Sequence, residues 1–61
     1  MAYQLAYIYA RRGDFEKTFY WLERAYQQGD PGMRQLKVDP IFKNIHGEQR
    51  YQQLLRKMRL L

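Results

Sequence analysis

The stretch GDFEKTFYWLERAYQQGDPG, residues 13–32, predicts a complete helix with its start and its stop. Asp14 can cap the first turn, and Gly29 suits the left-handed position that follows a last turn. We therefore expect a helix over about residues 15–28. Apolar or small side chains recur along it at helical spacing and form one stripe: Phe15, Thr18, Phe19, Leu22, Ala25 and Tyr26.

Three neighbouring aromatic residues in this stretch cannot share a face, because consecutive helical residues lie about 100° apart. Phe19 falls on the apolar stripe and is predicted to be core. Tyr20 points nearly opposite, toward water or a partner. Trp21 lies at the edge of the stripe, where the segment after the helix can cover it.

The residues before this stretch predict another helix, over about residues 2–12. One apolar face is formed by Ala2, Leu5, Ala6 and Tyr9, and a second stripe beside it by Tyr3, Tyr7, Ala10 and Arg11. Only Gly13 and Asp14 separate the two predicted helices. Such a short break makes them antiparallel neighbours, so residues 1–30 are expected to form a helical hairpin.

The second half, residues 31–61, predicts two short helices and a final capping helix. Asp30-Pro31 and Asp39-Pro40 each place a capping acid before a proline that can occupy a first helical position. The short pieces, about 31–36 and 40–45, should lie across the open end of the hairpin through Met33, Leu36, Val38, Ile41, Phe42 and Ile45. After Gly47 a last helix carries Tyr51, Leu54, Leu55, Met58 and Leu61 on one face. The sequence therefore predicts a single all-α domain over residues 1–61.

From these stripes we expect a core made of Leu5, Ala6, Tyr9, Phe15, Phe19, Leu22, Ala25, Leu54 and Leu55. The chain has 61 residues, of which 46% are hydrophobic and 16% aromatic, so one small core is the most it can form. It has no cysteine, which excludes disulfides and thiolate chemistry. No apolar run is long enough to span a membrane, and we expect neither a secretory signal nor a membrane partner. A cytoplasmic protein is the expectation.

No enzymatic constellation is present in the sequence. His46 is the only histidine, and general acid–base chemistry needs converging groups in a pocket. The chain has no serine, and Thr18 lies on the core stripe. We expect a surface or capping role for His46, no bound cofactor or metal, and no catalysis.

At this point several residues resemble a known repeat family. Leu5-Ala6, Tyr9, Gly13-Asp14-Phe15, Thr18, Leu22, Ala25 and Asp30-Pro31 resemble the tetratricopeptide repeat, a helix-turn-helix unit of about 34 residues. The segment WLERAYQQGDPGMRQLKVDPIF, followed by RYQQLLRKM, looks like the last repeat and closing cap of bacterial multi-domain regulators. The resemblance implies a module that binds other proteins and carries no chemistry of its own.

The resemblance also implies a binding surface, because the first helix of such repeats lines a groove that receives peptides. Tyr3, Tyr7, Ala10 and Arg11 match that face, and Tyr20 is the exposed aromatic left on the second helix. The alternative is that Tyr3 and Tyr7 pack against the returning C-terminal segment. A lone repeat leaves a face uncovered, so we also expect self-association, as a homodimer through the first helix.

A second functional class is nucleic-acid binding. The net charge of +5 comes from residues 31–61. The last helix there carries a basic patch made of Arg50, Arg56, Lys57 and Arg59. Basic side chains neutralise phosphates and aromatic rings stack on unpaired bases. The bases and the rings lie in different segments, however, and no nucleic-acid motif is present, so we rank this alternative below protein binding.

Overall fold

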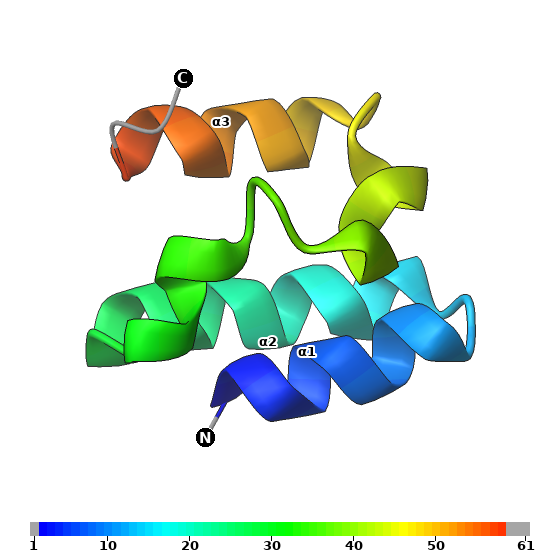
Figure 1. Ribbon diagram of the computed structural model, residues 1–61, viewed down its shortest axis with the longest axis horizontal. Helices are drawn as coiled ribbons and strands as arrows, with labels where there is room; N and C mark the ends of the chain where they lie inside the picture. Colours follow the sequence, from blue (N-terminus) through cyan, green and yellow to red (C-terminus); the bar gives the residue numbers. More distant parts are fainter. Residues whose placement is uncertain (1, 59–61) are drawn as a thin grey trace.

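The computed structural model describes residues 2–58 and is all-α, as the sequence predicts. Its elements are α1 (Ala2–Arg11), α2 (Phe15–Gln28), the 3-10 helices η1 (Pro31–Gln35) and η2 (Pro40–Ile45), and α3 (Gln49–Lys57). Figure 1 shows α1 and α3 at opposite edges of the molecule, with the 3-10 helices between α2 and α3. No strand occurs in this part of the chain.

The hairpin of α1 and α2 forms where the glycine-acid pair predicts it. Gly13 has a φ of +75°, a left-handed conformation that glycine adopts without steric cost. Asp14 then caps α2, because its Oδ1 accepts a hydrogen bond from the backbone N–H of Lys17 at 3.1 Å. Gly29 ends α2 in the same left-handed region, with a φ of +68°.

The two proline-initiated segments close one side of this hairpin. Asp30 Oδ1 accepts from the Gly32 N–H at 2.9 Å, and Asp39 Oδ1 accepts from the Ile41 N–H at 3.2 Å. Each acid therefore caps a helix of one to two turns. After η2, the chain turns at His46 and Gly47. It then returns as α3, on the side of the 3-10 helices away from α2 (Figure 1).

The core lies between the hairpin and its cap and receives side chains from every element. The buried apolar residues are Ala2, Tyr3, Ala6, Phe19, Leu22, Ala25, Met33, Leu36, Phe42, Ile45, Tyr51, Leu54 and Leu55. Thr18 is also fully buried, and its hydroxyl donates to the Asp14 carbonyl at 2.7 Å. Predicted core positions on α2 and α3 are thus confirmed at Phe19, Leu22, Ala25, Leu54 and Leu55.

Three apolar predictions are wrong, at positions that no element of the described range 2–58 covers. Leu5 and Phe15 are exposed rather than core, because η1, η2 and α3 pack on the other side of the hairpin. Val38 lies in the turn between η1 and η2 and is exposed as well. Tyr9 is only half-buried. The predicted contact of Leu61 lies outside the described residues.

Candidate functional site

The exposed large apolar residues of α1 are Leu5, Tyr7 and Ile8, which we together call the outer face of α1; Ile8 lies between the other two around the helix. These side chains are 36%, 38% and 44% exposed, respectively. Phe15, Tyr20 and Tyr26 are exposed to a similar extent on α2. Tyr7 and Ile8 line a shallow hollow of about 290 Å³, together with Tyr3 and Gln4. Ile8 belongs to neither predicted stripe of the first helix. An apolar residue outside the core stripe of an amphipathic helix is a sequence signal for an exposed contact.

Tyr3 does not belong to the open surface, contrary to the prediction for its stripe. It is only 8% exposed, and its hydroxyl donates to Asp39 Oδ2 at 2.8 Å. Its backbone N–H donates to Asp30 Oδ2 at 3.2 Å, and its ring meets Phe42 edge-on at 5.5 Å. For Tyr3, the alternative of packing against the returning segment is therefore correct.

Burial and the hydrogen bond to Asp39 raise the pKa of the Tyr3 hydroxyl above its ordinary value of 10.0. The N–H groups of Gly32 and Tyr3 lower the pKa of the Asp30 carboxyl below its usual 3.8. Both acids that cap the 3-10 helices thus also hold the start of α1. Tyr3 is a structural anchor.

The other residues predicted to contact a partner differ in their exposure. Tyr7 and Arg11 are exposed, whereas Ala10 is half-buried and packs against the core. Tyr20 is 51% exposed, as expected, but its ring contacts its own helix. It meets Trp21 edge-on at 5.0 Å, and the Arg24 guanidinium lies 5.9 Å from its centroid.

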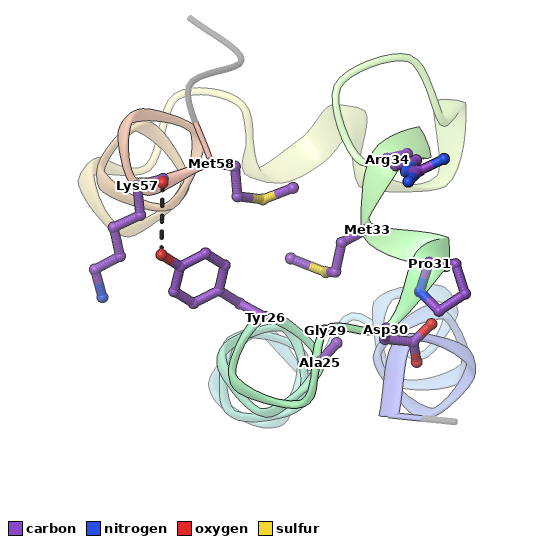
Figure 2. Close-up of a pocket in the computed structure, with 9 residues that line it drawn as sticks. All are labelled: Ala25, Tyr26, Gly29, Asp30, Pro31, Met33, Arg34, Lys57 and Met58. Atoms are coloured by element: carbon purple, nitrogen blue, oxygen red, sulfur yellow. Dashed lines mark hydrogen bonds between the residues drawn. The ribbon is translucent and has the colours of Figure 1, made fainter.

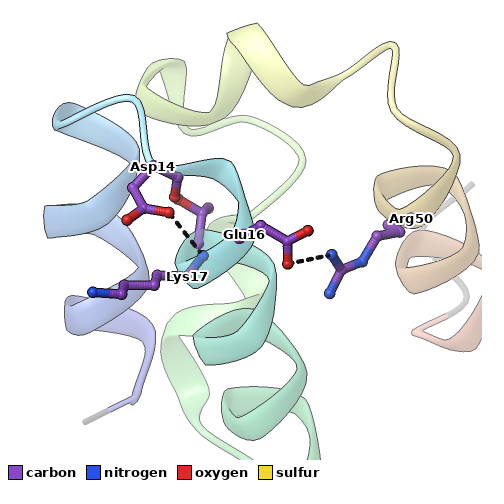
Figure 3. A network of polar contacts seen from close by, with 5 residues as sticks. Asp14, Glu16, Lys17 and Arg50 are labelled. Carbon is purple, nitrogen blue, oxygen red and sulfur yellow. Dashed lines mark hydrogen bonds and ion pairs between the residues drawn. The ribbon is translucent and has the colours of Figure 1, made fainter.

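Two members of the predicted basic patch hold α3 to α2. Arg50 lies over the Phe19 ring at 4.7 Å and pairs with Glu16 at 3.8 Å (Figure 3). Lys57 pairs with Glu23 at 3.4 Å. Arg56 is exposed, and Arg59 lies outside the described residues. Arg50 and Lys57 therefore have acidic partners within the fold, which sequence alone did not reveal.

A second hollow, of about 410 Å³, opens between the end of α2, η1 and α3. Figure 2 shows Met33 and Met58 facing each other across it, with the Tyr26 hydroxyl donating to the Lys57 carbonyl at 3.5 Å. The sequence pattern does not reveal this hollow, because Met33 and Met58 come from segments that are brought together only when η1 and α3 pack on the hairpin.

His46 is the C-cap residue of η2, where its backbone N–H, and not its side chain, donates to the Lys43 carbonyl at 3.2 Å. Its ring stacks on Tyr51 with centroids 4.6 Å apart, and its Nε2 is buried without a hydrogen-bond partner in the described part of the chain. Over residues 2–58, no three acidic or histidine side chains gather in a way that could hold a metal. No helix in that range is long and apolar enough to cross a bilayer.

Comparison with family models, curated proteins and solved structures gives no match.

Proposed function

We propose that this chain is a non-catalytic protein–protein interaction module of the tetratricopeptide type, with a contact surface on the outer face of α1. The observation that carries the proposal is the exposure of Tyr7 and Ile8, which line one hollow on α1, with exposed Leu5 one turn before Ile8. Exposed apolar clusters of this kind are typical of interaction sites. The proposal includes a cytoplasmic location.

The partner that fits this face in the isolated chain is a second copy. Arg11 is the only charged side chain of α1 and lies at its C-terminal end. If two copies of α1 pack antiparallel about a two-fold axis that passes near Tyr7 and Ile8, the two Arg11 residues lie on opposite sides of that axis, about 10 Å apart along the helix direction. The helix pair then buries Tyr7 and Ile8 at its centre without opposing like charges.

The small extent of α1 sets the strength of this association. A stable interface buries roughly 800 Å² on each partner, more than one short helix offers. We therefore expect a weak dimer that is populated only at high micromolar concentration. Because its contacts are apolar and aromatic, added salt should change it little.

A non-catalytic role is supported by the polar groups themselves. The Thr18 hydroxyl is fully buried and donates to the Asp14 carbonyl, and His46 stacks on Tyr51 at another place in the fold. No nucleophile and base converge in these positions. The nucleic-acid alternative has less support, because Arg50 and Lys57 are paired with Glu16 and Glu23.

Sedimentation equilibrium from low to high micromolar concentration tests the proposal. We expect a concentration-dependent dimer that Tyr7→Ala weakens at least tenfold. Tyr20→Ala is the matched control, because Tyr20 is an equally large exposed tyrosine on α2, and it should leave the dimer unchanged. A strict monomer at the highest concentration, or equal effects of both substitutions, would contradict the proposal.

A further inference from the structure

The six acidic residues of this chain are largely committed to holding its fold. Asp14, Asp30 and Asp39 cap α2, η1 and η2, and Glu16 and Glu23 pair with cations of α3. The remaining acid, Glu48, stands at the start of α3. Within residues 2–58, several exposed cations, among them Arg11, Arg12 and Lys17, form no ion pair, although Asp14 and Glu16 lie near the same turn.

Three of these cations gather at the turn between α1 and α2, and we call Arg11, Arg12 and Lys17 the turn cluster. The Arg12 guanidinium and the Lys17 Nζ lie 5.9 Å and 5.2 Å from the centroid of the same ring, that of Tyr9. Figure 3 shows Lys17 extending toward α1, while Glu16 leaves α2 on the other side, toward α3. None of the three cations forms an ion pair with another residue in the range 2–58.

The turn cluster borders an apolar contact point. Arg11, Arg12 and Ile8 together line a hollow of about 340 Å³. Ile8 is 44% exposed and provides an apolar side chain next to two guanidinium groups. Guanidinium groups bind carboxylates with paired hydrogen bonds, and Ile8 can contact an aliphatic side chain between such carboxylates.

We propose that the turn cluster binds an acidic segment of a partner protein, in which an aliphatic residue is flanked by aspartate or glutamate. The inference rests on the proposed function, because it names the chemistry of the partner that the module takes. It uses different side chains from the self-association surface, with only Ile8 in common. The positive charge of the whole chain, +5, favours the approach of an acidic partner.

A peptide fits this surface better than a nucleic acid does. Base recognition on single strands needs an aromatic face that is free for stacking. The Tyr9 ring is half-buried and already has Arg12 and Lys17 over it, so it offers no open platform. Ile8 adds an apolar contact that phosphates and sugars do not use.

Fluorescence anisotropy with a labelled peptide, acetyl-Glu-Asp-Leu-Glu-Asp-amide, tests the inference at concentrations where sedimentation finds a monomer. The amide peptide, with Gln and Asn in place of the acids, is the ligand control. We expect the acidic peptide alone to bind, with an affinity that falls as salt rises. No binding of the acidic peptide, or equal binding of both peptides, would overturn the inference.

Charge-reversal variants separate a local site from the effect of net charge. Arg12→Glu should weaken peptide binding at least tenfold, and Lys17→Gln should weaken it severalfold. Arg34→Glu is the matched control, because Arg34 is an exposed arginine on η1 that changes the net charge equally and should preserve binding within twofold. Equal losses for Arg12→Glu and Arg34→Glu would overturn the inference, as would tighter binding of a thymidine oligonucleotide than of the peptide.

Two further measurements distinguish a failure of the peptide site from misfolding of a variant and from a failure of the proposed dimer. Circular dichroism of each variant should match the parent chain, because Arg12 and Lys17 are exposed. Tyr7→Ala should weaken the dimer at least tenfold and preserve peptide binding, whereas Arg12→Glu should weaken peptide binding at least tenfold and preserve the dimer. Loss of peptide binding in Tyr7→Ala would show that the two surfaces are one, and would contradict the separate site.

Discussion

Tyr3 and Tyr7 lie one turn apart on α1, yet they belong to two different surfaces. Tyr3 is 8% exposed and is tied to Asp30, Asp39 and Phe42, whereas Tyr7 is 38% exposed beside Ile8. The same residue type thus anchors the cap at one position and remains accessible at the next. Residues four apart lie on nearly the same side of a helix, so the difference lies along the axis of α1. Asp30, Asp39 and Phe42, at the starts of η1 and η2, reach Tyr3 near the beginning of α1.

The largest effect should come from removing the cap residue that Tyr3 contacts. Phe42 is fully buried, and Phe42→Ala leaves a cavity between η2 and the hairpin. Substitutions of this kind cost about 3–5 kcal/mol, which is most of the stability of a domain this small. Urea unfolding followed by circular dichroism should show a largely unfolded chain in water. A smaller loss of stability for Phe42→Ala than for Tyr7→Ala would contradict the central place of Phe42 in the packing of η2 on the hairpin.

A smaller effect is expected where the backbone of η1 approaches Tyr3. A Cβ at Gly32 would lie 2.8 Å from Cγ of the Tyr3 ring, so Gly32→Ala must displace that ring. Overpacking of this kind costs about 1–3 kcal/mol. Gly47→Ala is the matched control, because nothing lies within 4 Å of its added Cβ, and urea midpoints should show it to be nearly neutral. Equal midpoints for both variants would show that the approach to Tyr3 is not tight.

The smallest effect should be on the pH dependence of the free energy of unfolding, through Asp30 at the start of η1. The pKa of Asp30 is lowered in the folded chain by the N–H groups of Gly32 and Tyr3, so its contribution is present above the unfolded value of 3.8 and is lost as pH falls through the folded value. Asp30→Asn should flatten the loss of stability below about pH 4, measured by urea midpoints. An unchanged slope in Asp30→Asn would remove Asp30 from the account.

Local signals in the sequence were sufficient to predict where the helices of this fold begin and end. The pairs Gly13-Asp14, Asp30-Pro31 and Asp39-Pro40 mark element boundaries through backbone chemistry that acts over a few residues. The first helix ends at Arg11, one residue before the predicted end. Phe19 and Tyr20 separate into core and surface as helical spacing requires.

Which side of the hairpin is buried could not be predicted from such local signals. Leu5 and Tyr3 are both compatible with a core stripe, and only the placement of η1 and η2 decides that Tyr3 is buried and Leu5 is not. The pairing of Arg50 with Glu16 likewise depends on where α3 docks, 34 residues further along the chain from residue 16. The turn cluster was missed because its three cations meet only when the hairpin closes.

A dilution series of ¹H–¹⁵N spectra from low to high micromolar concentration tests whether copies of the chain associate through the outer face of α1. If the outer face of α1 is the accessible surface, the amides of Leu5, Tyr7 and Ile8 should shift with concentration. The amides of Gly32, Ile41 and Tyr51, on the capped side, should stay fixed. Spectra that do not change with concentration, or shifts centred on η1, η2 and α3, would contradict the account.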